Sequence, residues 1–205
     1  MNPRPAMSTQ LVDYFARLLP LTDAEAKALA EESHIETFAK GTLLLRAGQV
    51  ARECYFVLQG CVRQYYLVEG EERTTQFFTE EQWVVSLKSF AQQVPADHYF
   101  VCNENTTLVV GTAEKENQLY RRFPKFETLS RTVLERNLAE QQEMTARYLT
   151  DTPEQRYLYL LTSRPELLQR VPQYQLASYL GVKPESLSRI RKRMARRPPA
   201  TPVLP

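Results

Sequence analysis

The residues whose types and spacing most clearly suggest a chemical role lie near the C-terminal end of the chain. Ser186, Ser188, Arg189, Lys192 and Arg193 fall on one face of an expected helix. Small hydroxyls and forked guanidinium groups are side chains that reach base edges and phosphates in the major groove of DNA. The pattern therefore predicts a DNA-binding surface.

The residues around this face predict the helix-turn-helix that would position it. Ala177 is small enough for a second helix to cross closely, and Gly181 suits a turn that needs a positive φ. Pro184 suits the first position of the second helix. The buried side of that helix is expected to hold Leu187, Ile190 and Met194. A basic helical hairpin with a solvated face is the simpler alternative, but it does not require this combination of residues.

The charge distribution supports a nucleic-acid partner for this end of the chain. Residues 151–197 hold ten Lys and Arg against four Asp and Glu, which gives a net charge of +6. The whole 205-residue chain carries +2, so the remainder carries −4. A basic module at one end is the electrostatic footprint expected of a duplex binder.

The cysteine count and hydropathy indicate the compartment. Three widely spaced cysteines, Cys54, Cys61 and Cys102, do not suggest a disulfide framework and fit a reducing cytoplasm. No run of about 18 apolar residues predicts a membrane span. The first residues do not resemble a secretory signal. We therefore expect a cytoplasmic protein without a membrane partner.

Residues 34–114 have the pattern of a small antiparallel barrel or roll. Short β-rich runs recur about every ten residues, separated by turn signals. They comprise Ile35, Phe38 and residues 43–45, 55–58, 62–68, 74–78, 83–85, 99–101 and 108–110. Five glycines are expected at the turns between them, namely Gly41, Gly48, Gly60, Gly70 and Gly111.

Helices are expected on both sides of this roll. Residues 10–32 are predicted to be helical, with a capped restart at Thr22. A long helix is predicted over residues 123–150, and another from Thr152 to Arg164. The apolar stripe of the long helix comprises Phe126, Leu129, Val133, Leu138, Met144 and Tyr148. This stripe packs either along the chain's own roll or against a second copy, and we favour dimerisation.

The order of these parts resembles the catabolite activator and fumarate–nitrate regulator (Crp/Fnr) family of bacterial transcription regulators. Residues 34–43, 47–49 and 54–63 resemble the first strands of the family's sensor roll, and the helix-turn-helix completes the match. The resemblance implies an α+β fold with an N-terminal antiparallel, jelly-roll-like β-roll, a long dimerisation helix and a C-terminal helix-turn-helix. The implied domains are a sensor (1–118), the dimerisation helix (119–150), a DNA-binding domain (151–197) and a disordered tail (198–205).

The resemblance also distributes roles over the second helix. The family's base-reading positions correspond to Pro184, Glu185, Ser186, Ser188 and Arg189. Arg189 is the best candidate for a bidentate contact to guanine. Glu185 either accepts a hydrogen bond from cytosine N4 or only complements the positive end of the helix. Phosphate anchors are expected at Gln173, Lys183, Arg191, Lys192 and Arg193.

The same helix departs from many relatives, which follow it with a β-hairpin wing. Eleven residues come after Met194, and four of them are proline, which cannot donate a hydrogen bond to a strand ladder. We therefore expect no wing, and we expect Arg196 and Arg197 to assist in phosphate anchoring.

The expected effector pocket departs from the cyclic-nucleotide cradle of the family. There a Gly-Glu pair binds the ribose and an Arg neutralises the cyclic phosphate. Here Val85 and Ser86 lie near the Gly-Glu position, and Asp97 or His98 lies near the Arg position. An aspartate facing a phosphate would repel it, so cyclic AMP or GMP is not expected to bind in the usual way. The candidate pocket comprises Trp83, Val85, Ser86, Lys88, Asp97, His98 and Tyr99.

Other classes of site have little support. No cysteine precedes Cys54, which disfavours an iron–sulfur cluster of the family's type. His34 and His98 lack the spacing of a metal site, and no nucleophile–base pattern indicates an enzyme. We predict no cofactor and a homodimeric regulator that binds an inverted-repeat duplex and an unidentified small-molecule effector. The alternative is a ligand-sensing or interaction module with weak or lost DNA binding.

Overall fold

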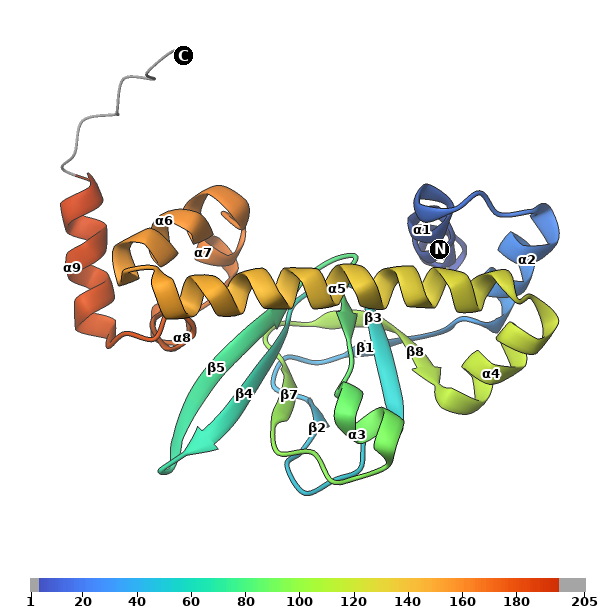
Figure 1. Ribbon diagram of the computed structural model, residues 1–205, viewed down its shortest axis with the longest axis horizontal. Helices are drawn as coiled ribbons and strands as arrows, with labels where there is room; N and C mark the ends of the chain where they lie inside the picture. Colours follow the sequence, from blue (N-terminus) through green and yellow to red (C-terminus); the bar gives the residue numbers. More distant parts are fainter. Residues whose placement is uncertain (1–3, 196–205) are drawn as a thin grey trace, which may run out of the picture.

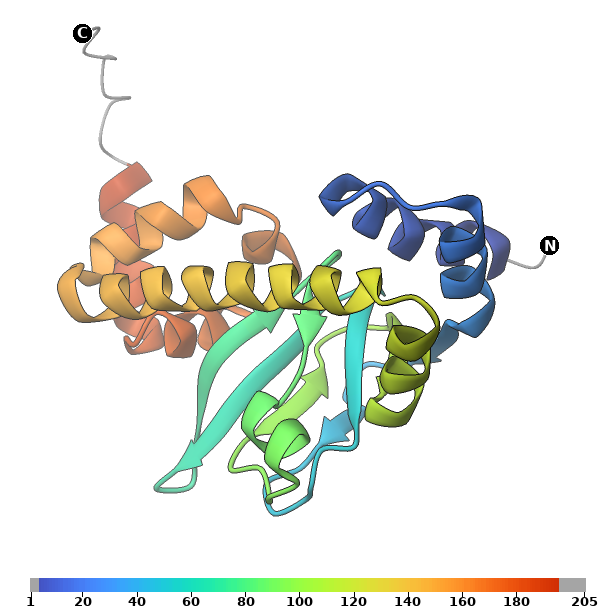
Figure 2. The same ribbon diagram turned by 45° about the vertical axis from the view of Figure 1, so that its right-hand side comes forward.

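The computed structural model describes residues 4–195, which form a β-roll crossed by one long helix (Figure 1). Helix α5 (Lys125–Thr150) passes over the roll along the longest dimension of the molecule. Figure 2 shows α1 (Arg4–Leu18) and α2 (Asp23–Glu32) near the start of α5 and the C-terminal helices gathered at its other end. None of the described helices combines the length and apolar character that crossing a bilayer requires.

The roll consists of two four-stranded antiparallel sheets. The first has the order β1 (His34–Phe38), β8 (Thr106–Thr112), β3 (Glu53–Gln59), β6 (Trp83–Val84). The second has the order β2 (Leu43–Leu45), β7 (Tyr99–Cys102), β4 (Val62–Val68), β5 (Glu71–Phe78). These strands contain the β-rich runs of the sequence, so the predicted roll is confirmed.

Strand β3 shows why the roll needs a helical cover. Val57 faces the core between the sheets, whereas the neighbouring Phe56 faces outward against α1 and α5. Both side chains are fully buried, because the outer face of the first sheet is covered by helices. An antiparallel strand that is apolar on both faces needs a packing partner on each face to bury its side chains.

The N-terminal helices supply part of that cover. Helices α1 (Arg4–Leu18) and α2 (Asp23–Glu32) are separated at Pro20, and Thr22 and Glu25 form a reciprocal capping box at the start of α2. Lys125 at the start of α5 donates to Glu25 Oε2 at 2.8 Å. The predicted break and restart in this region are confirmed.

Two helices, each of which follows a strand of the roll, were not predicted from the sequence. Helix α3 (Leu87–Gln92) has only six residues, and α4 (Ala113–Arg122) has a short apolar face, Leu119 and Tyr120, that is only partly buried. Helix α4 begins where Thr112 Oγ1 accepts a hydrogen bond from the Lys115 N–H. Residues 119–122 end α4, and α5 begins at Lys125.

One of the glycine predictions is wrong. Gly41, Gly48, Gly60 and Gly70 have positive φ, but Gly111 lies inside β8 with an ordinary strand conformation. A Cβ atom at Gly111 would lie 2.9 Å from Cys54 Sγ. Glycine is therefore required there by close packing between β8 and β3, and no turn is involved.

The apolar stripe of α5 divides into two halves. Phe126, Leu129 and Val133 are buried against the chain's own roll. By contrast, Leu138 is 61% exposed and Leu149 is 78% exposed. Packing along the chain's own roll therefore accounts for the first half of the helix, including Val133, and leaves the leucines of the second half exposed.

The C-terminal helices form a separate apolar cluster beside β5. They are α6 (Pro153–Ser163), α7 (Leu167–Arg170), α8 (Gln173–Tyr179) and α9 (Pro184–Ala195). Thr152 and Gln155 form the capping box of α6, which confirms the predicted start. The helix ends at Ser163 with Arg164 as its C-cap, which agrees with the predicted end. The predictions for Arg196, Arg197, the missing wing and the tail at 198–205 lie outside the described residues.

Candidate nucleic-acid interface and effector cavity

Helices α8 and α9 pack as a compact pair, here called the α8–α9 unit. Ala177 on α8 has no exposed surface, and Leu187 and Ile190 of α9 are buried beside it. Gly181 in the connection has φ of +69°, and the Val182 N–H donates to the Ala177 carbonyl at 2.9 Å. The positive φ favours glycine, and a Cβ at this position would also displace the Tyr148 ring, whose hydroxyl would lie 2.7 Å away.

The outer side of the α8–α9 unit carries most of the residues that the sequence analysis selected. Ser186 and Ser188 are half-buried. The exposed candidates are Gln173, Lys183, Pro184, Glu185, Arg189, Arg191, Lys192 and Arg193. Arg189 Nη2 donates to Ser186 Oγ at 3.2 Å, which holds the guanidinium near the start of α9. The fold thus brings the selected residues of α9 together on one accessible surface.

Arg193 differs from its neighbours on α9. Its guanidinium forms an ion pair with Glu154 of α6. In contrast, Lys183, Arg189, Arg191 and Lys192 have no ion-pair partner within residues 4–195. Arg193 therefore links α9 to α6 and is less available to a phosphate than the other four cations.

Three further arginines of the C-terminal helices are used inside the protein. Arg156 Nη1 donates to the Asp151 carbonyl at 2.7 Å. Arg164 Nη1 donates to the Phe77 carbonyl at 2.8 Å, and Arg170 Nη1 lies 2.7 Å from Glu80 Oε2. The positive charge of this region is therefore divided between internal arginines and the exposed cations of α9 and the turn before it.

Helix α8 is fixed to the outer edge of β5. The Thr74 N–H donates to Ser178 Oγ at 2.9 Å, and Ser178 Oγ donates to the Glu72 carbonyl at 3.1 Å. Phe77 and Tyr179 meet edge to face with ring centroids 5.3 Å apart. Since β5 is an edge strand, one serine satisfies backbone groups that would otherwise lack a ladder partner.

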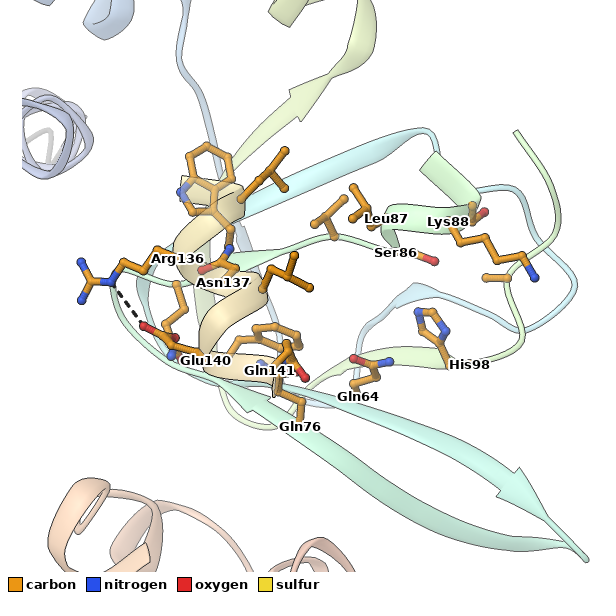
Figure 3. A pocket seen from close by; sticks show the side chains of 18 of the residues that line it. Gln64, Gln76, Ser86, Leu87, Lys88, His98, Arg136, Asn137, Glu140 and Gln141 are labelled. Atoms are coloured by element: carbon orange, nitrogen blue, oxygen red, sulfur yellow. Dashed lines mark hydrogen bonds and ion pairs between the residues drawn. The ribbon is translucent and has the colours of Figure 1, made fainter. Parts of the chain in front are cut away.

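A cavity of about 860 Å³ lies between the roll and α5 (Figure 3). Its wall includes six of the seven residues selected for an effector pocket, namely Trp83, Val85, Ser86, Lys88, Asp97 and His98. The seventh, Tyr99, lies outside this wall and stacks on Tyr65 with ring centroids 4.8 Å apart.

The charges of the cavity are mostly paired. Arg17 Nη2 lies 2.6 Å from Glu81 Oε2, and Arg136 Nε lies 3.3 Å from Glu140 Oε1. The hydrogen bond from His98 lowers the pKa of Asp97, which is therefore a carboxylate at neutral pH. Lys88 is exposed and is the one cation of this wall without an ion pair among the described residues.

The sequence analysis missed the amide side chains of the cavity. Gln64 and Gln76 come from β4 and β5, while Asn137 and Gln141 come from α5 (Figure 3). Gln64 and Gln76 are paired in register on neighbouring strands, and Gln141 Nε2 donates to Gln76 Oε1. Alternation along β4 and β5 could have assigned the two strand residues to one face, but the contribution of α5 depends on how the helix docks.

The three cysteines are buried as free thiols. Burial raises the pKa of Cys102 to about 11 and that of Cys61 to about 12. Burial and the nearby Glu116 carboxylate raise the pKa of Cys54 further. All three are therefore protonated at neutral pH and are poor nucleophiles.

The described residues also include no group of three or more His, Cys, Asp and Glu side chains arranged to hold a metal ion. His34 pairs with Glu36, with Nε2 3.6 Å from Oε2, and lies on β1, whereas His98 lies on β7 beside Asp97.

Comparison with known proteins agrees with this architecture. Residues 35–123 match the family model described as the cyclic nucleotide-binding domain. No curated protein sequence matches the chain significantly. Solved structures of similar fold include the c-di-GMP responsive global regulator CLP from Xanthomonas campestris, with a TM-score of 0.67 and 19% identity over 85% of this chain and 92% of that one.

Two further structures share the fold. The catabolite activator protein of Thermus thermophilus has a TM-score of 0.55 and 20% identity over 89% of this chain and 86% of its own. CooA from Carboxydothermus hydrogenoformans has a TM-score of 0.62 and 16% identity over 81% of this chain and 78% of its own. Residues 35–123 are therefore similar to the cyclic nucleotide-binding domain, within a chain that has the fold of Crp/Fnr-type regulators.

Proposed function

We propose that the protein is a cytoplasmic, homodimeric transcription regulator whose α8–α9 unit is a helix-turn-helix that places α9 in the major groove of DNA. The observation that carries this proposal is the group of cations without ion-pair partners among residues 4–195, Lys183, Arg189, Arg191 and Lys192, opposite the buried Leu187 and Ile190. A cation that is held in an internal ion pair contributes little to neutralising a phosphate, whereas these four cations are accessible. In this proposal the protein is not an enzyme.

Within this surface we assign two kinds of contact. Arg189 lies near the start of α9 and reads a guanine, with Pro184, Glu185, Ser186 and Ser188 beside it at the base edges. Phosphate contacts come from Gln173, Lys183, Arg191 and Lys192, with Arg193 secondary because it is paired with Glu154.

The proposed dimer forms through the second half of α5. Leu134, Leu138 and Leu149 are 43%, 61% and 78% exposed. Spacings of four and eleven residues are about one and three helical turns, so the three leucines share one face. Two such faces packed together would give a two-fold dimer, which presents two α9 helices to an inverted repeat with half-sites about 34 Å apart.

The sensor domain is proposed not to bind cyclic AMP or cyclic GMP in the family's usual manner. In support, no arginine of the cavity wall lacks an acidic partner among the described residues, and Asp97 contributes a negative charge. Titration calorimetry with cyclic AMP, cyclic GMP and cyclic di-GMP should show no binding at millimolar ligand. The third nucleotide is included because CLP is a c-di-GMP responsive regulator. Micromolar binding that is lost on Ser86→Ala substitution would contradict the proposal.

The DNA-binding proposal is tested by selection from a random duplex library, followed by fluorescence anisotropy on the enriched duplex. An inverted repeat should be enriched, and the affinity should fall steeply with salt concentration. Enrichment of no inverted repeat, together with binding no tighter than to random duplex, would favour the alternative of a ligand-sensing or interaction module with weak or lost DNA binding.

A further inference from the structure

The cavity between the roll and α5 is lined with neutral hydrogen-bonding groups from two separate elements. Gln64 and Gln76 belong to the roll, whereas Asn137 and Gln141 belong to α5. Figure 3 shows these side chains converging from the two sides. Each amide offers both donors and an acceptor without a net charge. A ligand that bonds to both sets would connect the sensor roll to the helix proposed to form the dimer.

His98 provides a buried hydrogen-bonding position in the same cavity. The residue is 8% exposed, and its imidazole extends between Gln64 and Lys88 toward Ser86 (Figure 3). Its Nδ1 lies 2.9 Å from Asp97 Oδ1, but its Nε2 is buried without a hydrogen-bond partner among the described residues. Buried polar atoms are almost always partnered, so an unpartnered one in a cavity indicates a ligand or an ordered water.

The hydrogen bond to Asp97 also determines what His98 offers. Because Asp97 is ionised, it can only accept, so neutral His98 must carry its proton on Nδ1. Its Nε2 is then an acceptor that requires an N–H or O–H group from its partner. The anionic oxygens of a phosphate diester lack such a donor and so cannot bond to the Nε2 of this neutral form.

The charge of the cavity wall also disfavours a phosphate. Arg17 and Arg136 are each bound to a glutamate, and Glu80 is bound to Arg170. The cation of the wall without an ion pair among the described residues, Lys88, is exposed and acts electrostatically on the Asp97 carboxylate. An anion entering this wall would lose hydration without gaining a free buried cation. Apolar side chains, Phe78, Trp83 and Val85 among them, complete the wall and suit an amphipathic molecule.

We infer that this cavity binds a neutral, metabolite-sized organic molecule that carries hydrogen-bond donors, held by His98 Nε2 and by the amides of Gln64, Gln76 and Gln141. The inference rests on the proposed function only in treating the cavity as the effector site of the regulator. An aromatic or aliphatic body would lie along the apolar wall while the donors meet His98 and the amides. Binding across Gln76 and Gln141 would replace their direct hydrogen bond and so change how β5 is held against α5.

The test is a fragment screen of the full-length protein by saturation-transfer NMR. The panel contains equal numbers of neutral, cationic and anionic heteroaromatic compounds on matched scaffolds, and the anionic members carry carboxylates or phosphates. Neutral members with N–H or O–H donors should dominate the hits. His98→Phe, which keeps the ring volume but removes Nε2, should weaken their binding about tenfold. His98→Gln, which restores an acceptor, should recover part of the affinity.

Two amide variants complete the experiment. Gln141→Leu should weaken the same hits, whereas Asn117→Leu on the exposed side of α4 should not. Thermal unfolding of each variant establishes that it is folded. Hits that are mainly anionic, hits that are insensitive to both His98→Phe and Gln141→Leu, or the absence of hits would each overturn the inference. DNA affinity measured without any added compound tests the proposed function separately, since it does not depend on what the cavity binds.

Discussion

The outer face of α9 and the cavity under α5 both contain several charged side chains, but the two regions hold them differently. On α9 and the turn before it, Lys183, Arg189, Arg191 and Lys192 are exposed and have no ion-pair partner among the described residues. In the cavity, Arg17 and Arg136 are bound to carboxylates, and the remaining polar groups are mostly amides. The number of basic residues is therefore a poor guide to where an anion could bind. The better guide is whether each cation is already paired with a carboxylate.

The same contrast exists within the C-terminal helices. Arg164 and Arg170 belong to the most basic part of the sequence, yet both are bound to the roll. They tie the end of α6 and helix α7 to the roll, while Lys183, Arg189, Arg191 and Lys192 remain available. Substitutions in each group test whether the paired arginines stabilise the fold while the unpaired cations bind DNA.

The largest effect is expected from the face that we propose for dimerisation. Leu138→Glu combined with Leu149→Glu places charges on an exposed apolar face and should give a monomer. Because a dimer gains affinity from two linked half-sites, DNA binding should weaken roughly 100-fold or more. Light scattering and anisotropy measure the two outcomes. The control is Thr132→Glu, an exposed position on another face of α5. A double variant that keeps the wild-type mass would exclude this face.

An intermediate effect is expected from the cations of α9. Arg189→Ala should cost about 1–3 kcal/mol of DNA-binding free energy and relax the preference at one base pair in each half-site. Lys192→Ala should weaken binding to all sequences alike and lower the salt dependence by about one unit of slope for each phosphate that is no longer neutralised. Anisotropy over a salt series, with matched and single-base-changed duplexes, distinguishes the two. Equal behaviour of both variants across sequences would contradict the groove assignment.

The smallest effect on DNA binding is expected from a paired arginine. Arg170→Ala removes a guanidinium that is 23% exposed and bonded to Glu80 and Glu104, and should lower the free energy of unfolding by about 1–2 kcal/mol. The slope of DNA affinity against salt should stay unchanged, because Arg170 is not available to a phosphate. Arg121→Ala, an exposed cation on α4, serves as the control and should leave stability nearly unchanged.

The pH dependence of the Arg170 variant adds a second measurement to that prediction. Burial raises the pKa of Glu80, but hydrogen bonds from Arg170 and the Gly60 N–H outweigh it, so the pKa lies below its ordinary value of 4.5. A lowered folded-state pKa contributes stability above the unfolded-state value, and this contribution is lost as the pH falls through the folded value. Arg170→Ala should therefore reduce the loss of stability below about pH 4.5. An unchanged acid limb in denaturant titrations would show that the pair contributes little.

Much of this architecture could be predicted because its signals are local. Strand runs with turn glycines, the capping boxes at Thr22 and Thr152, and the spacing of Leu187 and Ile190 each depend on neighbours within one or two turns. Helices α3 and α4 were missed since one is very short and the other has only Leu119 and Tyr120 as large apolar residues. Gly111 was misassigned because the atom that excludes a larger residue, Cys54 Sγ, lies on another strand.

By itself, the sequence determined the order of elements, the basic character of the C-terminal helices and the surface of α9 that could meet DNA. Only the tertiary structure decided which arginines are free and which are bound, since Arg170 and Glu80 are 90 residues apart in the chain. Docking likewise divided α5 into a half that covers the roll and a half that remains exposed. It also joined Gln76 to Gln141 across the cavity. Pairing and burial depend on which surfaces meet, and local spacing carries no information about contacts at that range.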